Sequence, residues 1–585
     1  MTYPSSTVLI RTNAGQYTGI GHLVRCLQLA EQLVARQAKV IFVLDFIETN
    51  ITPFLTDYLV ETLYDEVQAE ISAQEDAIKF VKLLNQYQAT HVIIDDYRLD
   101  HHWEKSVKHH HQKPLTLVAI DDILREHDCD ILVDMKWRGD DTQNAYDHLL
   151  PQQAIKLLGP KYVLLNKQYQ NNEANLPKWD ISQKEPTAIN SQNSSSPFTV
   201  MLGLGGGGDL AQFQQLLDNV LNSKHSLNVH LKILVVLGPL STNSQALIKQ
   251  YADNDQVELL IGKTDLYPYL QKTHLYIGAA GGILYQLLAL NIPALTFAIA
   301  DNQASEKTQL AQLGHYFHLD NLSELMPEKL VYFIESISTH YPRIINLLQN
   351  AETKIDAMGA SRVAEQILSL NKTPCNGQNT TTDSNIDSNL SSKNVDELHQ
   401  KKPSVKSNEY LDFPGGYQLR AVDDSDVNHY LACRNLPSNC QNMINAEPIP
   451  YLSHYTWWFN AKRDSFLLSQ AGKPVLYIWH EIKHVQQKKY LIGGWFTCER
   501  EIGFQEALLA LNWQLEYCQK VFPNIPWLAV IHRKNKFVRL LNKYLGFTDV
   551  GTEHAYSLAI ETLFNDADYH DFHYVTYTAN SENNK

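Results

Sequence analysis

Residues 19–26, Gly-Ile-Gly-His-Leu-Val-Arg-Cys, carry the clearest chemical pattern in the chain. They follow an apolar run at 8–11 that predicts a strand, and they open a stretch typical of a helix. Backbone N–H groups at such a helix start can face an anion, and Gly19 and Gly21 would allow its close approach. The same helix dipole favours a neutral His22, which suits this residue to act as a base. Glycine also relieves strain at ordinary strand-to-helix turns, so this segment alone leaves a purely structural interpretation open.

Further polar and aromatic clusters follow in a fixed order. They are Asp95-Asp96-Tyr97, Leu99-Asp100, Trp103-Glu104, Asp121-Asp122, His127-Asp128-Cys129-Asp130, Leu158-Gly159-Pro160-Lys161-Tyr162 and Ala300-Asp301-Asn302-Gln303. With Gly-x-Gly-His-x-x-Arg-Cys, this order resembles the nucleotide-sugar hydrolases of pseudaminic acid synthesis, over about residues 7–310. Those enzymes release UDP from UDP-2,4-diacetamido-2,4,6-trideoxy-β-L-altropyranose. The resemblance implies a GT-B-like fold and a metal-independent, inverting hydrolysis.

The resemblance also implies roles for individual residues. His22 would be the base that activates water, while Tyr97 and Asn302 would line the reacting sugar and help to place it. The residues expected to bind the sugar nucleotide are Gly19, Gly21, Arg25, Gly206, Gly207, Gly281, Gly282, Gln286, Asp301 and Gln303. Because UDP is a good leaving group, an oriented water, a base and donors around the pyrophosphate suffice. We expect neither a metal nor another cofactor for this step.

Purely structural interpretations stay open at several of these positions. Tyr97 could be an aromatic residue packed near a strand end, and Asn302 could cap a helix. Asp128-Cys129-Asp130 imitates the Asp-x-Asp metal motif of other glycosyltransferases, although the same stretch matches a structural part of the hydrolase family.

The glycine loops expected to hold the nucleotide follow the family's pattern unevenly. Residues 205–209 match its Gly-Gly-Ser-Asp turn. Where the family has Gly-Gly-Ser-Thr followed by Glu, residues 280–286 read Ala-Gly-Gly-Ile-Leu-Tyr-Gln. A glutamate can accept both ribose hydroxyls, whereas Gln286 has one acceptor oxygen and an amide donor. We therefore expect ribose binding to be weaker or differently arranged.

Short β-rich runs alternate with helical stretches in two successive parts of the chain. The expected strands are 8–10, 40–44, 91–95, 116–120 and 131–133, then 198–204, 231–237, 257–261, 275–278 and 294–297. This alternation predicts parallel sheets with crossover helices. We expect an α/β protein with a Rossmann-like domain at 1–175, which carries the histidine loop, and a Rossmann-like nucleotide-binding domain at 198–370, in a GT-B-like arrangement.

A third domain is expected beyond a linker. Residues 371–409 are rich in Asn, Ser and Thr and contain no aromatic residue, which is typical of a flexible linker. Residues 410–565 predict an α+β domain, followed by a tail at 566–585. Asn535-Lys536-Phe537 and Leu545-Gly546-Phe547 resemble GNAT acetyltransferases.

That resemblance implies acetyl-CoA as a possible cofactor of the third domain. The residues that would bind it are Arg500, Gly503 and Asn535. The family's loop ends in a small residue, where this chain has Gln505, and Glu499 and Glu501 add negative charge nearby. Acetyl transfer and a catalytically silent role both stay open.

Composition excludes some partners. The formal net charge of −15 and the absence of a basic tract argue against nucleic acid. Seven thinly spread cysteines, without zinc-ligand spacing, and an N-terminal segment unlike a secretory signal favour the cytoplasm. Residues 275–300 carry no charge, but glycines and Pro293 divide them, so we expect buried strands and a helix rather than a membrane span.

The sequence as a whole predicts a hydrolase that releases UDP from a UDP-2,4-diacetamido-2,4,6-trideoxyhexose in nonulosonic acid synthesis. A fused N-acetyltransferase would act on the same class of amino sugar. Two alternatives stay open: a GT-B glycosyltransferase that uses a UDP-amino sugar, and a non-catalytic nucleotide-sugar binding protein. The oligomeric state and the stereochemistry of the sugar are not determined by the sequence.

Overall fold

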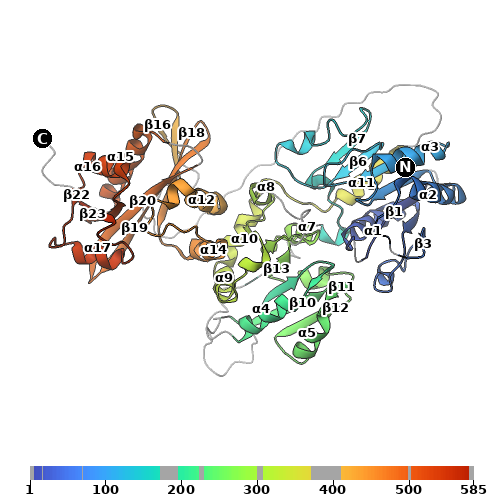
Figure 1. Ribbon diagram of the computed structural model, residues 1–585, viewed down its shortest axis with the longest axis horizontal. Coiled ribbons are helices and arrows are strands. Elements are labelled where there is room, and N and C mark those ends of the chain that lie inside the picture. The colour runs from blue at the N-terminus through green and yellow to red at the C-terminus, as the bar shows by residue number, and fades with distance from the viewer. Residues whose placement is uncertain are drawn as a thin grey trace, which may run out of the picture. The chain divides into compact units, whose positions relative to one another are not determined.

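The computed structural model describes residues 6–15, 18–66, 68, 70–170, 179, 196–222, 229–298, 307–370, 410–498 and 502–578 (Figure 1). The chain divides into two compact units, Met1–Asn379 and Thr380–Lys585. The linker expected at 371–409 lies outside the described residues.

The first unit begins with a seven-stranded parallel sheet. Its strands are β1 (Thr7–Thr12), β2 (Lys39–Leu44), β3 (Leu59–Thr62), β4 (His91–Asp95), β5 (Thr116–Ile120), β6 (Ile131–Asp134) and β7 (Ile155–Leu158). The strand order is β3-β2-β1-β4-β5-β6-β7, the Rossmann order with one added edge strand. Every residue of β4 and β5 is buried, since helices cover a parallel sheet on both faces. The three α-helices between these strands are α1 (Gly21–Val34), α2 (Ala73–Tyr87) and α3 (His101–His110).

A second parallel sheet repeats this order with six strands, β12-β10-β8-β13-β14-β15. They are β8 (Phe198–Gly203), β10 (Leu231–Leu237), β12 (Val257–Ile261), β13 (Leu275–Ala279), β14 (Ala294–Phe297) and β15 (Phe317–His318). A separate small pair consists of β9 (Gly207–Asp209) and β11 (Leu240–Thr242). The helices are α4 (Ala211–Leu221), α5 (Ser244–Tyr251), α6 (Tyr267–Leu270), α7 (Ile283–Ala289), α8 (Lys307–Gln312), α9 (Pro327–Thr339), α10 (Tyr341–Gln349) and α11 (Gly359–Ser369). Both Rossmann-like domains are confirmed.

The last helix of this part returns to the first domain. Helix α11, drawn in yellow, lies beside the blue α1 (Figure 1). Arg36 donates a 2.7 Å hydrogen bond to Ser361 Oγ, and a Cβ on Gly359 would lie 2.3 Å from the carbonyl oxygen of Val163. The second domain expected at 198–370 therefore ends in a helix that packs on the first domain. The return of α11 to the first domain joins the two sheets into one GT-B-like unit.

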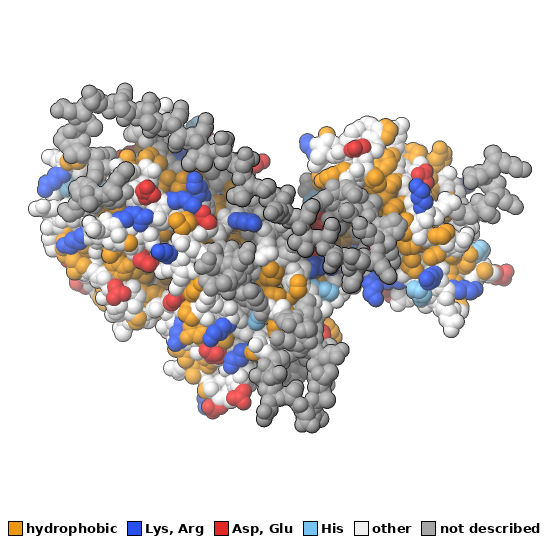
Figure 2. Space-filling model, turned by 180° about the vertical axis from the view of Figure 1, so that it is seen from behind, with side chains coloured by type: hydrophobic (Ala, Val, Ile, Leu, Met, Phe, Trp, Pro, Cys, Tyr) orange, Lys and Arg blue, Asp and Glu red, His pale blue; other side chains and the backbone are white. Residues whose placement is uncertain are grey.

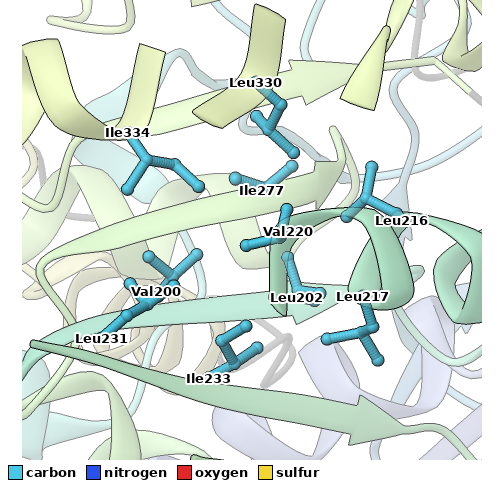
Figure 3. A pocket seen from close by; sticks show the side chains of 10 residues that line it. All are labelled: Val200, Leu202, Leu216, Leu217, Val220, Leu231, Ile233, Ile277, Leu330 and Ile334. Carbon is cyan, nitrogen blue, oxygen red and sulfur yellow. The ribbon is translucent and has the colours of Figure 1, made fainter. Parts of the chain in front are cut away.

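The second domain contains one apolar gap of about 10 Å³ between its sheet and the helices above it (Figure 3). Its walls are aliphatic side chains from β8, β10, β13, α4 and α9. This volume is at the lower limit for a single water, and a water there would find no polar partner. The gap is a packing defect of the core rather than a binding site.

The second unit is built on an eight-stranded mixed sheet, β16-β17-β18-β19-β20-β21-β23-β22. Its strands are β16 (Leu411–Phe413), β17 (Tyr417–Ala421), β18 (Asp464–Gln470), β19 (Lys473–Val485), β20 (Lys488–Thr497), β21 (Trp527–His532), β22 (Thr548–Asp549) and β23 (Phe572–Tyr577). The helices are α12 (Val427–Arg434), α13 (Pro437–Cys440), α14 (Tyr451–Asn460), α15 (Phe504–Val521), α16 (Lys536–Tyr544) and α17 (Ser557–Leu563). The parallel strands β20 and β21 pair only at Leu491 and Trp527, so they diverge beyond this point, as in a GNAT-like fold.

One boundary of this domain was wrong in the sequence analysis. The tail expected at 566–585 contains β23, which lies between β21 and β22 and pairs with both. Its alternating pattern, Phe-His-Tyr-Val-Thr-Tyr, buries four of its six residues. The domain expected to end at 565 therefore extends at least to Tyr577.

The uncharged stretch at 275–300 forms β13, α7 and β14 as far as it is described, as expected for a buried core. Among the described residues, no helix combines the length and the apolar character needed to cross a bilayer. Figure 2 shows Lys and Arg side chains scattered among Asp, Glu and uncharged side chains on the visible described surface.

Candidate functional site

The histidine loop lies at the point where the first sheet reverses its strand order. Strands β1 and β4 are neighbours; from β1 the chain runs outward through β2 and β3 to one edge of the sheet, and from β4 it runs outward through β5, β6 and β7 to the other. In open α/β sheets this switch point at the carboxyl ends of the strands is the usual ligand site. The segment that follows β1 brings His22, and the end of β4 brings Asp95 and Tyr97.

His22 is held by a buried carboxylate. It is the second residue of α1, and its Nδ1 lies 2.6 Å from Oδ1 of the fully buried Asp95. Burial alone would raise the pKa of Asp95, but Arg25 and His22 outweigh burial and hold this pKa well below its usual range. Asp95 is therefore an anion at neutral pH, and it is positioned to accept a hydrogen bond from an imidazole N–H of His22.

This geometry selects one form of the neutral His22 ring. Two acceptor atoms cannot share a 2.6 Å contact, so Nδ1 must carry the proton that it donates to Asp95. The Arg25 guanidinium, 3.1 Å from the same Nδ1, is satisfied by the two oxygens of Asp95. The lone pair of the ring is then on Nε2, which is the arrangement of a general base oriented by a carboxylate.

Arg25 links two carboxylates of the first domain. Its Nε and Nη2 donate to the two oxygens of Asp95 at 2.7 and 2.6 Å, and Nη1 donates to Asp122 at 2.9 Å. All three nitrogens thus have carboxylate partners, which suits Arg25 to position the site. Its expected contact with the sugar nucleotide stays a prediction.

Tyr97 closes this cluster from the side. Its ring meets the His22 ring edge-on with 4.4 Å between centroids, and its hydroxyl donates to Asp122. The backbone carbonyl of Tyr97 accepts from Arg125, which pairs with Asp121. The structure therefore brings Tyr97 together with His22, and its hydroxyl lies on a chain of hydrogen bonds through Asp122 and Arg25.

The Asp128-Cys129-Asp130 stretch makes contacts within the first domain that hold neighbouring elements together. Asp130 Oδ2 accepts a 2.8 Å hydrogen bond from the backbone N–H of Leu117, Cys129 is buried, and Asp128 pairs with Lys108 at 3.2 Å. These contacts tie the stretch to β5 and α3. They favour the structural interpretation over a metal motif.

Two expected glycines of the second domain are packed closely. A Cβ on Gly206 would lie 2.3 Å from Cγ1 of Ile20, two residues before His22, and one on Gly207 would lie 3.0 Å from Leu240 Cβ. The Gly206 loop, which follows β8, therefore touches the histidine loop directly. By contrast, a Cβ on Gly19, Gly21 or Gly282 would meet no described atom within 4 Å.

The segment 280–286, whose last four residues begin α7, also contacts the first domain. Gln286 Oε1 accepts a 2.9 Å hydrogen bond from the hydroxyl of the buried Tyr169. Burial, followed by the charges of Asp134 and Asp122, raises the pKa of Tyr285, while Arg25 opposes this shift. The hydroxyl of Tyr285 lies 3.5 Å from the carbonyl oxygen of Met135, in the first domain.

Gly281 accepts a 3.0 Å hydrogen bond from the backbone N–H of Leu284, and its expected contact with the nucleotide stays a prediction. The other remaining residues divide into two groups. Asp301, Asn302, Gln303 and Arg500 lie outside the described residues. Gly503 and Asn535 both lie at helix starts: Glu506 accepts from the Gly503 N–H, and Asn535 accepts from Val538 N–H at 3.1 Å. Both residues therefore have a structural role as helix caps, which explains their presence without acetyl-CoA.

Sequence reasoning did not assign Asp95, Asp122 or Tyr285 to the site. Asp95 and Asp122 stood in motifs quoted for the resemblance, and each follows or ends a buried strand. Charged residues at the carboxyl ends of neighbouring parallel strands were the signal that could have identified them.

Comparison with known proteins gives limited additional support. No family model matches the chain. Over 132 residues, 22% of the chain, it is 24% identical to the spore coat polysaccharide biosynthesis protein SpsG of Bacillus subtilis (strain 168). The chain spans only 39% of that relative's length.

Three solved structures show similarity to parts of the chain. Acinetobacter baumannii MurG is 14% identical with a TM-score of 0.41, covering 63% of this chain and 100% of MurG. UDP-GlcNAc 2-epimerase from Neisseria meningitidis is 13% identical with a TM-score of 0.40, covering 62% and 100%. A GNAT-family acetyltransferase from Streptococcus pneumoniae is 12% identical with a TM-score of 0.23, covering 28% and 98%. The fold assignment therefore rests on the strand orders rather than on these similarities.

Proposed function

We propose that the first unit hydrolyses a UDP-2,4-diacetamido-2,4,6-trideoxyhexose, as a step of nonulosonic acid synthesis. The observation that carries the proposal is the 2.6 Å contact between His22 Nδ1 and the buried Asp95 at the switch point of the first sheet. The resemblance of the motifs to the hydrolases of pseudaminic acid synthesis and the similarity to a polysaccharide biosynthesis protein support it.

In the proposed reaction, His22 Nε2 takes a proton from water while the water oxygen attacks C1 of the sugar. The bond between C1 and the β-phosphate oxygen breaks, and its electron pair leaves with UDP. Asp95 stabilises the imidazolium that forms, without taking the proton itself. Arg25 holds Asp95 and Asp122 in place. The backbone at Gly19, Gly21 and Gly282, where side-chain space is open, is proposed to lie against the nucleotide.

The test uses the full chain and a panel of UDP-diacetamido-trideoxyhexoses, with UDP and free sugar measured together. In ¹⁸O-labelled water, attack at C1 leaves the released UDP unlabelled. We expect His22→Ala to lower kcat by about 100-fold or more, because a general base contributes on this order. His148→Ala, which changes an exposed histidine of the same domain, is the matched control. Native turnover by a folded His22→Ala protein would contradict the proposed base, and turnover only with an acceptor would favour a glycosyltransferase.

A second activity, N-acetyl transfer from acetyl-CoA, is proposed for the second unit. The divergence of β20 and β21 after Leu491 and Trp527, just before α15, favours it. The Gly503 N–H, which would face the cofactor, already bonds to Glu506. Acetyl-CoA binding to the full chain, and its gain in a Glu506→Ala variant, would test this role; no binding by either protein would favour a silent domain.

A further inference from the structure

The second unit contains a cluster of three metal-ligating side chains that neither proposed activity uses. His429 and Cys433 lie one helical turn apart on α12, and Cys498 directly follows β20. One ligand atom from each residue lies within 4.8 Å of the others. Both cysteines are buried, whereas His429 is half-buried, so the cluster borders the surface on the histidine side.

One distance in this cluster is that of two ligands in a tetrahedral site. His429 Nε2 lies 3.6 Å from Cys433 Sγ. A zinc ion at about 2.3 Å from sulfur and about 2.0–2.1 Å from nitrogen would separate these two ligands by roughly 3.5–3.6 Å. The distance between the atoms is therefore already that of two ligands on one ion, without a change of backbone.

Supporting contacts orient the ligands. His429 Nδ1 lies 2.7 Å from the hydroxyl of the buried Tyr477, which leaves Nε2 as the ligating atom. The amide of Asn439 donates to the carbonyl oxygens of Cys433 and Thr497 at 2.7 and 2.8 Å. Asn439 thus ties the backbone of one cysteine to the residue that precedes the other.

We propose that His429, Cys433 and Cys498 bind a divalent cation of the zinc class. Two thiolates would balance the charge of the ion in a buried setting, and an imidazole with two thiolates is a ligand set that zinc prefers. Three protein ligands leave the fourth position to water or to an exogenous group. The sequence alone did not indicate the site because Cys498 is distant in the chain and reaches α12 only through the packing of β20.

The test titrates the full, reduced, chelator-stripped chain with Co²⁺ as a probe. We expect one equivalent with a thiolate-to-cobalt charge-transfer band, and competition by Zn²⁺. Binding at the Asp100, His101 and His102 cluster would lack this band, since it contains no sulfur. Cys433→Ser and Cys498→Ser should each lose the band, while Cys440→Ser, a buried cysteine of α13 outside the cluster, should keep it.

Tyr477→Phe and Asn439→Ala keep every ligand and should weaken Co²⁺ binding about 10–100-fold, the usual cost of losing a residue that supports a ligand. If a cysteine variant does not fold by circular dichroism, Tyr477→Phe decides, and unchanged affinity overturns the proposal. A wild-type chain without the band, an unchanged band in Cys433→Ser, or a Cys433–Cys498 disulfide in place of the metal would also overturn it.

Discussion

Replacing Asp95 by asparagine isolates the role of the carboxylate behind His22. Asp95 accepts from four donors: His22 Nδ1, two nitrogens of Arg25 and the thiol of Cys26. An asparagine has one acceptor oxygen, and its NH₂ group must face either His22 together with the Nη2 of Arg25, or the Nε of Arg25. If the NH₂ group faces His22, the neutral imidazole must carry its proton on Nε2, and this nitrogen can then no longer act as the base. Facing the Nε of Arg25, the NH₂ group would set two donors against each other and displace the guanidinium.

We expect Asp95→Asn to lower kcat between about 100-fold and 10,000-fold. The upper figure corresponds to a base locked in the wrong tautomer. At 1.36 kcal/mol per factor of ten, the loss corresponds to roughly 3–5 kcal/mol of transition-state stabilisation. KM should change far less, because Asp95 is fully buried and does not face the substrate.

The assay measures UDP release over a range of substrate concentration and pH. Asp45→Asn is the matched control, because Asp45 is equally buried and pairs with Arg11 at 2.5 Å and Arg98 at 2.8 Å. Both variants lose a buried ion pair, which can cost about 3–5 kcal/mol of stability, so thermal unfolding is measured for each. If Asp95→Asn folds and keeps the wild-type kcat, or if Asp45→Asn loses as much activity, the carboxylate does not orient the base.

Two further predictions test other parts of the first unit. Gly206→Ala should lower kcat/KM about 5–100-fold, because its Cβ would press on Ile20 and overpacking costs about 1–3 kcal/mol. An added Ile20→Ala change should restore kcat/KM. If it does not, the contact between the two loops is not the cause of the loss. Burial would lower the pKa of His127, but Asp121 and Glu104 outweigh it and raise this pKa to about 9. Its stabilising contribution is therefore complete below about pH 6.5, the unfolded pKa, and is lost as pH rises through 9, by about 3 kcal/mol. Thermal unfolding of wild type and His127→Gln between these pH values checks this, and equal pH slopes would contradict it.

The sequence predicted the central strands of both Rossmann-like domains because their apolar runs are continuous. Strand β3, Leu-Val-Glu-Thr, was missed since it is an edge strand with no buried residue, so its pattern does not report a core. In β7 the exposed Lys156 interrupts a short apolar run, so only two of its four residues are buried, and the two-residue β15 is too short to be distinguished from a loop. Strand β23 was missed because the polar segment before it suggested that the domain had ended.

Site residues that are close together in the sequence could be predicted, whereas contacts between residues on different strands could not, because they depend on the strand order. Gly19, Gly21, His22 and Arg25 share one loop and helix, and the structure keeps them together. The partnership of His22 with Asp95 arises because β4 lies beside β1, which no spacing in the sequence encodes. The same holds for Ile20 and Gly206, which meet only when two separate sheets pack into one unit.

Gln286 shows how such a long-range contact changes a local expectation. The sequence argument compared the lone pairs of glutamate and glutamine toward ribose hydroxyls. In the structure, Tyr169 already donates to the single amide oxygen of Gln286. A glutamate here could accept from Tyr169 with one oxygen and from ribose with the other, whereas glutamine keeps one lone pair on its shared oxygen and two N–H donors. A ligand hydroxyl that meets this side chain would therefore find one acceptor lone pair in place of a whole free carboxylate oxygen, and amide N–H groups that donate to it. The expected ribose contact at this position would thus depend on how Tyr169 holds the amide, a dependence that comparing the lone pairs of the two side chains alone does not reveal.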